Sequence, residues 1–385
     1  MNLSKKRESA LDDFILSLAR LPYSQPFFPA KSEVLSINWD VFINKVYIEG
    51  LSGLLSYNIA HYPNIQFIPQ WVKDRLKEDY IYNTGRNIFI EEELKKLFKI
   101  FQASELSILI FKGAVFFNRL YPSLGIRPMA DVDIAIRKED HFKAKEILTS
   151  CGYKYPKGYP FLFYKDSFYL DLHLDTTGLW RVSTWPGAIN IKTKEVWEKT
   201  EAIDKNLPLV RTLWVYDSLL ACCEHLQRHS FKQLIWFIDI SMMIRHKGNS
   251  FNWSILFKRA KQFGLEKSLL FVLRYLNMAG FVFIPTKVLS YLDGISLNRF
   301  EKRSLTMLLN NRRDNIPGEL LFLFATKGIK SKFMLVYQIL YMRQEQFPLA
   351  VEHVGIWMYL KRACMIIAYI ITKMFALLKP AGNKL

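Results

Sequence analysis

Three acidic side chains at defined spacing are the residues of this chain best suited to do chemistry. Asp131 and Asp133 lie two apart in the segment ADVDIAI, and Asp171 lies in FYLDLHL. Alternate residues of a strand point to the same face, so Asp131 and Asp133 are predicted to project side by side. Two such carboxylates repel each other, so either one is protonated or a cation lies between them. Together with Asp171 they are expected to form an oxygen site for Mg²⁺ or Mn²⁺ that bridges substrate phosphates.

Phosphate-binding groups are predicted just upstream of these acids. The apolar run LSILIF (106–111) is broken by Lys112 and Gly113, and a short helix follows. A strand that turns into a helix at a glycine offers backbone N–H groups to an anion. Lys112 would add a positive charge at this turn, and Arg127 a planar fork that suits phosphate oxygens.

Three histidines could contribute to a site, although each also has a packed alternative. His173 shares the strand face of the third aspartate, where it would orient a carboxylate, contact substrate or pack in the core. His225 and His229 are four apart, the helical spacing of a paired metal site, but no glutamate completes a zinc protease motif. Trp236 and Asp239 follow on the next predicted helix. The favoured interpretation is therefore a polar contact between two helices at the edge of the cleft.

The hydrophobic periodicity predicts an α+β architecture. Helical spacing dominates residues 8–104 and returns from Leu207 onward. Between these parts we expect strands at 106–111, 130–136, 161–165 and 168–174, and helices at 114–120 and 138–150. This order predicts a small mixed sheet with helices against it. The predicted division is an N-terminal helical region (1–104), a catalytic core (105–205) and a basic C-terminal helical domain (206–385).

Composition narrows the class of protein. Half of the 385 residues are hydrophobic and 15% are aromatic, which excludes a disordered chain. The four cysteines lack zinc-ligand spacing and the N-terminus lacks the apolar run of a signal peptide, so free thiols in the cytoplasm are expected. The apolar stretch 363–378 is interrupted by Lys373 and too short to span a bilayer. It predicts a buried or surface-lying amphipathic helix, with peripheral membrane contact possible through 361–379.

Positive charge is concentrated in the C-terminal part. Residues 241–385 hold 22 Lys/Arg against 7 Asp/Glu, which accounts for most of the net charge of +18. Such an imbalance favours a polyanionic partner, namely nucleic acid, an anionic membrane surface or a phosphorylated substrate. A solvated basic surface that only aids solubility is the alternative.

The stretch 106–153, followed by FYLDLHL, resembles the uncharacterised bacterial nucleotidyltransferase family of the polymerase-β superfold. The shared features are a KG turn after a strand, a loop ending in RPMADVD, a helix leading to GY, and DLH. The resemblance implies that the three aspartates are metal ligands and that Lys112, Gly113 and Arg127 lie in the phosphate region. Unlike the wider superfold, this chain has Ala114 where a serine or second glycine is usual, and a longer loop before Asp131.

The resemblance further implies a metal-dependent transferase that moves a nucleoside monophosphate from an NTP, ATP among the candidates, to an acceptor. Mg²⁺ or Mn²⁺ would be the cofactor, and pyrophosphate the second product. RNA, a phosphorylated small molecule and a modified peptide all suit a basic surface as acceptors. Two alternatives stay open. One is a nucleotide-binding module without turnover, which the missing serine favours, and the other is a transferase that uses a nucleotide-activated sugar donor.

Overall fold

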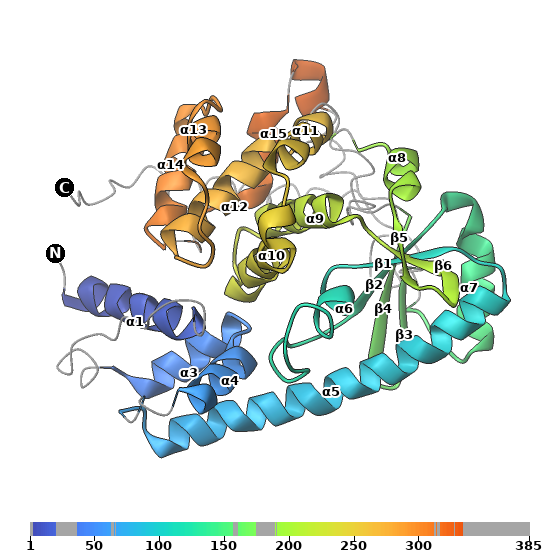
Figure 1. Ribbon diagram of the computed structural model, residues 1–385, viewed down its shortest axis with the longest axis horizontal. Helices are drawn as coiled ribbons and strands as arrows, with labels where there is room; N and C mark the ends of the chain where they lie inside the picture. The colour runs from blue at the N-terminus through green and yellow to red at the C-terminus, as the bar shows by residue number, and fades with distance from the viewer. Residues whose placement is uncertain are drawn as a thin grey trace, which may run out of the picture.

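The computed structural model (Figure 1) has the predicted α+β architecture, with helices at both ends of the chain and a sheet between them. It describes residues 3–20, 37–62, 65, 67–156, 161–174, 189, 191–311, 313, 316–326 and 328–333. The predicted amphipathic helix at 363–378 and the contact segment 361–379 lie outside these residues. Within the described residues, no helix is both long enough and apolar enough to cross a membrane.

One six-stranded mixed sheet forms the centre of the catalytic part. Its strands are β1 (Ile108–Phe111), β2 (Val132–Ile136), β3 (Leu162–Lys165), β4 (Phe168–His173), β5 (Glu201–Asp204) and β6 (Leu207–Thr212). They lie in the order β3-β4-β2-β1-β6-β5. Strand β2 runs antiparallel to β1 and parallel to β4, and β1 runs parallel to β6. The central strands β1 and β2 are almost entirely apolar, as expected for strands that are covered on both faces.

Helices surround the sheet and build the two ends of the chain. The N-terminal helices are α1 (Leu3–Ala19), α3 (Trp39–Ile48), α4 (Ser52–His61) and α5 (Gln70–Ala103). Around the sheet lie α6 (Gly113–Phe116), the short 3₁₀ helix η1 (Lys138–Asp140), α7 (His141–Ser150) and α8 (Thr193–Glu198). The C-terminal part holds α9 (Val215–Arg228), α10 (Leu234–Lys247), η3 (Gly248–Ser250), α11 (Trp253–Phe263), α12 (Glu266–Met278), α13 (Thr286–Asp293), α14 (Arg299–Leu309) and α15 (Gly318–Ala325).

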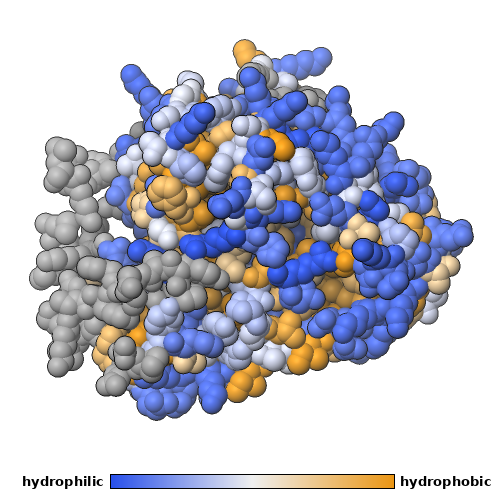
Figure 2. All heavy atoms as spheres, in the orientation of Figure 1, coloured by the Kyte–Doolittle hydropathy of each residue, from blue (hydrophilic) through white to orange (hydrophobic). Residues whose placement is uncertain are grey.

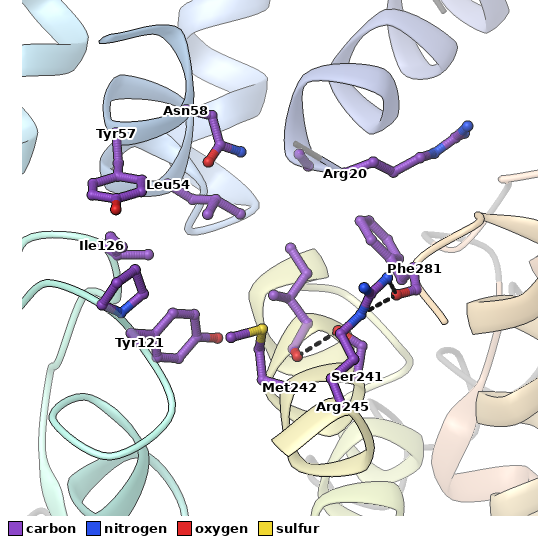
Figure 3. A pocket seen from close by; sticks show the side chains of 13 residues that line it. Arg20, Leu54, Tyr57, Asn58, Tyr121, Ile126, Ser241, Met242, Arg245 and Phe281 are labelled. Carbon is purple, nitrogen blue, oxygen red and sulfur yellow. Dashed lines mark hydrogen bonds between the residues drawn. The ribbon is translucent and has the colours of Figure 1, made fainter. Parts of the chain in front are cut away.

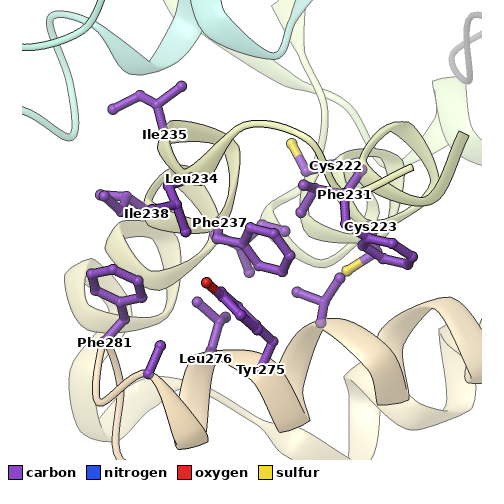
Figure 4. Packing of buried hydrophobic residues seen from close by; sticks show 14 of the residues in the cluster. Cys222, Cys223, Phe231, Leu234, Ile235, Phe237, Ile238, Tyr275, Leu276 and Phe281 are labelled. Atoms are coloured by element: carbon purple, nitrogen blue, oxygen red, sulfur yellow. The ribbon is translucent and has the colours of Figure 1, made fainter. Parts of the chain in front are cut away.

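Two hydrophobic cores hold these elements. The smaller core lies between the sheet, α7 and the second half of α5. The larger core contains residues of α1, α3 and α4 together with residues of α9 to α14, so the two helical ends of the chain pack on each other. Figure 4 shows the part of it where Phe231, Phe237 and Tyr275 pack between α9, α10 and α12. The Phe237 and Tyr275 ring centroids are 4.3 Å apart. On the face shown in Figure 2, hydrophilic side chains cover most of the surface, with apolar ones between them.

The structure corrects several predicted element boundaries. Residues 201–212 form the β5–β6 hairpin, so the prediction that helices resume at Leu207 is wrong. The signal was an Asx-type turn, in which the Asp204 side chain accepts a hydrogen bond from the Asn206 backbone at 2.8 Å, followed by β-branched residues. The predicted helix at 114–120 is only α6, and the predicted helix at 138–150 begins as η1. The sheet therefore extends to Thr212, beyond the boundary predicted at residue 205.

Candidate active site

Asp133 and Asp171 lie side by side on neighbouring strands. The parallel β2–β4 register places Asp133 opposite Asp171, and the antiparallel β1–β2 register places Phe111 opposite Asp133. Both carboxylates are partly accessible, with side-chain exposures of 14% for Asp133 and 24% for Asp171. Most of the other residues of these two strands are apolar and buried, which fixes the two carboxylates at one edge of the core.

Lys112 and His173 converge on the same oxygen of Asp133. The ammonium of Lys112 and Nε2 of His173 each lie 2.8 Å from Asp133 Oδ1. Burial alone would raise the pKa of Asp133, but the positive charge of Lys112 and the hydrogen bond from His173 outweigh burial and hold that pKa well below its ordinary value. Asp133 is therefore a carboxylate at neutral pH.

The KG turn brings Lys112 to this position by an unusual backbone conformation. Lys112 has φ 55° and ψ −138°, a region that non-glycine residues rarely adopt. Its side chain is buried, and the ammonium lies 4.9 Å from the centroid of the Phe111 ring. Strain of this kind persists only where the surroundings enforce it, and it is concentrated at functional sites.

Asp131 lies just before β2, and its side chain is exposed. The pKa of Asp131 is raised, mainly because surrounding protein atoms partly desolvate its carboxylate and also because of the negative charge of Asp133. Asp171 has a smaller effect in the same direction. Asp131 is thus close enough to interact electrostatically with the other two acids.

A possible metal-binding group is present among the described residues. One ligand atom each from Asp133, Asp171 and His173 lies within 4.8 Å of the others. Asp131, predicted as the third ligand, does not belong to this group. The two carboxylates fit Mg²⁺ or Mn²⁺, which prefer oxygen ligands. Since Nε2 of His173 lies at hydrogen-bonding distance from a carboxylate, it carries the proton, and His173 is better placed to orient Asp133 than to bind a cation.

Arg127 is committed to a buried ion pair. Its Nε and Nη2 donate to the Asp239 carboxylate at 2.8 to 3.1 Å, and its Nη1 contacts the Pro128 carbonyl and the Met129 sulfur. Arg127 and Asp239 are 7% and 2% exposed. The Tyr121 hydroxyl donates to the same carboxylate at 2.7 Å. Every guanidinium nitrogen of Arg127 already has a partner within the protein. The phosphate contact of Arg127 therefore stays an untested prediction.

Arg127 also explains the glycine of the KG turn. A Cβ on Gly113 would lie 2.5 Å from Nη1 of Arg127, so the guanidinium packs directly against the turn. Helix α6 after the turn has only four residues, and the Val115 N–H already donates to the Lys112 carbonyl. The contact between Arg127 and Gly113 supports the turn. The phosphate cradle that the sequence predicted at this turn stays a prediction.

A row of polar side chains on α5 holds the loop that carries Arg127. Asn83 donates to the Gly125 carbonyl, and Asn87 donates to the carbonyls of Leu124 and Arg127. Arg86 donates to the carbonyls of Met129, Ala130 and Ser167. Sequence reasoning missed these residues. The available signal was a pair of asparagines four apart and fully or nearly buried on one helix face, where a polar group requires a partner.

Helix α9 lies near the Lys112–Asp133 pair, since both charges act on His225, and helix α10 carries the Asp239 that pairs with Arg127. His225 and Trp236 ring centroids are 4.5 Å apart, and those of His229 and Trp236 are 5.5 Å apart, so these histidines contact α10 by ring packing, and the predicted polar character of the contact stays a prediction. Asp239, predicted to join them, pairs with Arg127 instead. Burial holds the pKa of His225 well below its ordinary value, and the nearby positive charge of Lys112 lowers that pKa further.

The mixed sheet with paired acids after a KG turn is the arrangement expected for a nucleotidyltransferase. A model of the family described as uncharacterised nucleotidyltransferase matches residues 36–278, well over half of the chain. The chain therefore belongs to this family, and the predicted membership is confirmed. The matched range begins just before α3 and ends with α12, so it includes the strands of the acidic cluster together with α5, α9 and α10. No curated protein and no solved structure matches the chain.

Proposed function

We propose that this chain transfers a nucleoside monophosphate from an NTP to an acceptor hydroxyl or phosphate. The observation that carries the proposal is the placement of Asp133 opposite Asp171, with Lys112 and His173 on Asp133, in a member of a nucleotidyltransferase family. In the reaction, an acceptor oxygen bonds to the α-phosphorus, the bond to the β-phosphate oxygen breaks, and pyrophosphate leaves. An acceptor hydroxyl would lose its proton to a carboxylate, for which Asp171 is our candidate.

The residues of the site have distinct roles in this proposal. Asp133 and Asp171, with Asp131 at the entrance, would hold Mg²⁺ or Mn²⁺, which when bound supplies Lewis acidity at the phosphates. His173 keeps the Asp133 carboxylate oriented, and Lys112 neutralises charge beside it. We assign Arg127 a positioning role, because it packs against Gly113 and its nitrogens are engaged by Asp239 and neighbouring atoms.

A polyanionic acceptor agrees with the charge of the chain. The part from residue 241 onward carries the large excess of Lys and Arg, and α10, where this part begins, contacts the site through the Asp239–Arg127 pair. RNA is therefore our first candidate acceptor, with a phosphorylated small molecule or peptide as the other. An RNA complex should weaken steeply as salt rises, because binding releases counterions. The KM for a small acceptor should change much less.

The test is incubation of purified protein with each α-labelled NTP, Mg²⁺ or Mn²⁺, and either total RNA or a small-molecule extract. Asp131→Ala/Asp133→Ala is the inactive variant. Asp166→Asn is the matched control, because Asp166 is exposed on the β3–β4 turn at φ 52°, a conformation that asparagine also adopts. Label on an acceptor with the wild type and with Asp166→Asn, but not with the double variant, supports the proposal and identifies donor and acceptor class.

Two other outcomes would overturn it. Metal-dependent nucleotide binding that needs the aspartates but gives no transfer would define a binding module. Transfer of label to the acceptor only from a nucleotide-activated sugar that is labelled in its sugar, with release of an unlabelled nucleoside mono- or diphosphate, would define a different donor class.

A further inference from the structure

A cavity lies apart from the acidic cluster, between the N-terminal helices and α10. Its volume is about 250 Å³, and its walls come from the end of α1, α4, the loop after α6, α10 and the segment after α12. Figure 3 shows Leu54, Ile126, Met242 and Phe281 around it, so most of the lining is apolar. At about 30 Å³ for each water-sized group, it has room for roughly eight such groups.

One end of this cavity is cationic. Arg20 and Arg245 both line it, at the end where Phe281 lies (Figure 3). Arg245 donates from Nε to the Phe281 carbonyl at 2.8 Å. Nε of Arg20 is buried and has no hydrogen-bond partner in the described part of the chain. None of the thirteen described lining residues is acidic.

A buried guanidinium N–H without a partner is costly, and an anion at this end of the cavity would satisfy it. Burial lowers the pKa of Arg20, and the negative charge of Asp13, which does not line the cavity, offsets only part of this effect. An apolar body attached to the anion would fill the rest of the cavity and be removed from water. The cationic end and the apolar remainder of the lining together fit a molecule that has an anionic group and an apolar body.

We propose that this cavity binds a small amphipathic anion, with one carboxylate or phosphate group at Arg20 and an apolar body of about six to eight carbons among Leu54, Ile126 and Met242. It is a second site, distinct from the nucleotide site. Tyr121, which lines the cavity, bonds to Asp239, and Asp239 holds Arg127 against the KG turn. A wall of three buried side chains thus separates the anion from the acidic cluster.

The experiment is isothermal titration calorimetry of the full chain with octanoate and hexyl phosphate, alongside octanol and hexylamine. Both anions should bind, with Kd below about 1 mM for the better one, and the tighter of the two identifies the head group. Octanol and hexylamine should bind at least tenfold more weakly. Failure of both anions to bind, or octanol binding as tightly as octanoate, overturns the proposal.

Two pairs of variants locate the site. Arg20→Gln should weaken anion binding at least tenfold, while Arg75→Gln, at an exposed position of α5, should leave it unchanged. Met242→Trp should abolish binding by filling the cavity, while Met278→Trp, at a 40% exposed position, should not. Undiminished binding by Met242→Trp with an unaltered far-ultraviolet dichroism spectrum would show that the anion lies elsewhere. The comparison of octanoate with octanol needs no variant, so it decides the proposal even where a variant does not fold.

Discussion

Asp239→Ala is expected to destabilise the protein strongly, because it leaves a buried guanidinium without its counter-ion. Arg127 is only 7% exposed and makes its charged hydrogen bonds to Asp239, which also accepts from the Tyr121 hydroxyl. Removal of one partner from a buried ion pair costs about 3–5 kcal/mol. The destabilisation by Asp239→Ala includes loss of the hydrogen bond from Tyr121. Tyr121→Phe removes that hydrogen bond alone and should therefore lower the free energy of unfolding by less, about 1.5–3 kcal/mol.

The assay is urea unfolding followed by circular dichroism, with the thermal midpoint as a second readout. Asp239→Ala should lower the midpoint by at least about 5 °C. Asp293→Ala is the matched control, because Asp293 pairs with Arg274 through a side chain that is 70% exposed. An exposed pair contributes about 0–1 kcal/mol. A double variant, Arg127→Met with Asp239→Leu, should recover much of the loss, because apolar residues can replace both buried charges.

The reasoning is refuted if Asp239→Ala costs no more than Asp293→Ala. The same variants separate two roles of Arg127. If Arg127 supports the KG turn, Asp239→Ala should reduce nucleotidyl transfer together with stability, since Arg127 loses its anchor. If instead Arg127→Met abolishes transfer while stability and the Asp239→Ala rate are unchanged, Arg127 contacts the substrate directly.

Three further predictions follow from single contacts. Gly113→Ala should reduce transfer at least tenfold and lower the free energy of unfolding by about 1–3 kcal/mol, because its Cβ would lie 2.5 Å from Nη1 of Arg127. Transfer assays and unfolding curves on the same variant check this, and no change in either would contradict the contact. Arg86→Ala should destabilise by about 1–3 kcal/mol and speed amide hydrogen exchange over 124–131, whereas unchanged exchange would show that α5 does not hold the loop. The pKa of His225 is lower in the folded protein than in the unfolded chain, so the unfolded state binds more protons at acid pH. The free energy of unfolding should therefore fall as pH drops below about 6.5, by up to about 1.4 kcal/mol per pH unit. Unfolding curves measured over a pH series should lose this slope in His225→Gln, and an identical slope in that variant would assign the effect to another group.

The sequence predicted the centre of the site because local patterns determine it. The alternation in ADVDIAI and FYLDLHL places Asp133 and Asp171 on strands, and both strands form. The pairing of those strands in parallel register, which puts the two acids opposite each other, follows from tertiary packing and was only a hypothesis. The same holds for His173, where the pattern left three roles open and the structure shows a hydrogen bond to Asp133.

Long-range partners were beyond local reasoning. Arg127 pairs with Asp239, 112 residues later in the chain, and no periodicity links the two. Strand β6 was missed because LPLVRT is short and lies just before the strong helical pattern of α9, yet it pairs with β1 at the centre of the sheet. Such pairings depend on which faces are buried in the folded protein, because propensity alone is overridden by tertiary contacts.

The most direct test of the proposed activity is the rate of α-label transfer by Asp171→Asn against wild type under saturating NTP and metal. Asp171 is the acid on the second strand, so its replacement by asparagine removes the negative charge and one carboxylate oxygen there, while the Lys112–Asp133–His173 contacts stay in place. We expect a fall of about a hundredfold to a thousandfold, of the size seen when a charge-stabilising group is lost, with Asp166→Asn at the wild-type rate. Transfer by Asp171→Asn within tenfold of wild type would contradict the assignment of this acidic cluster as the catalytic centre.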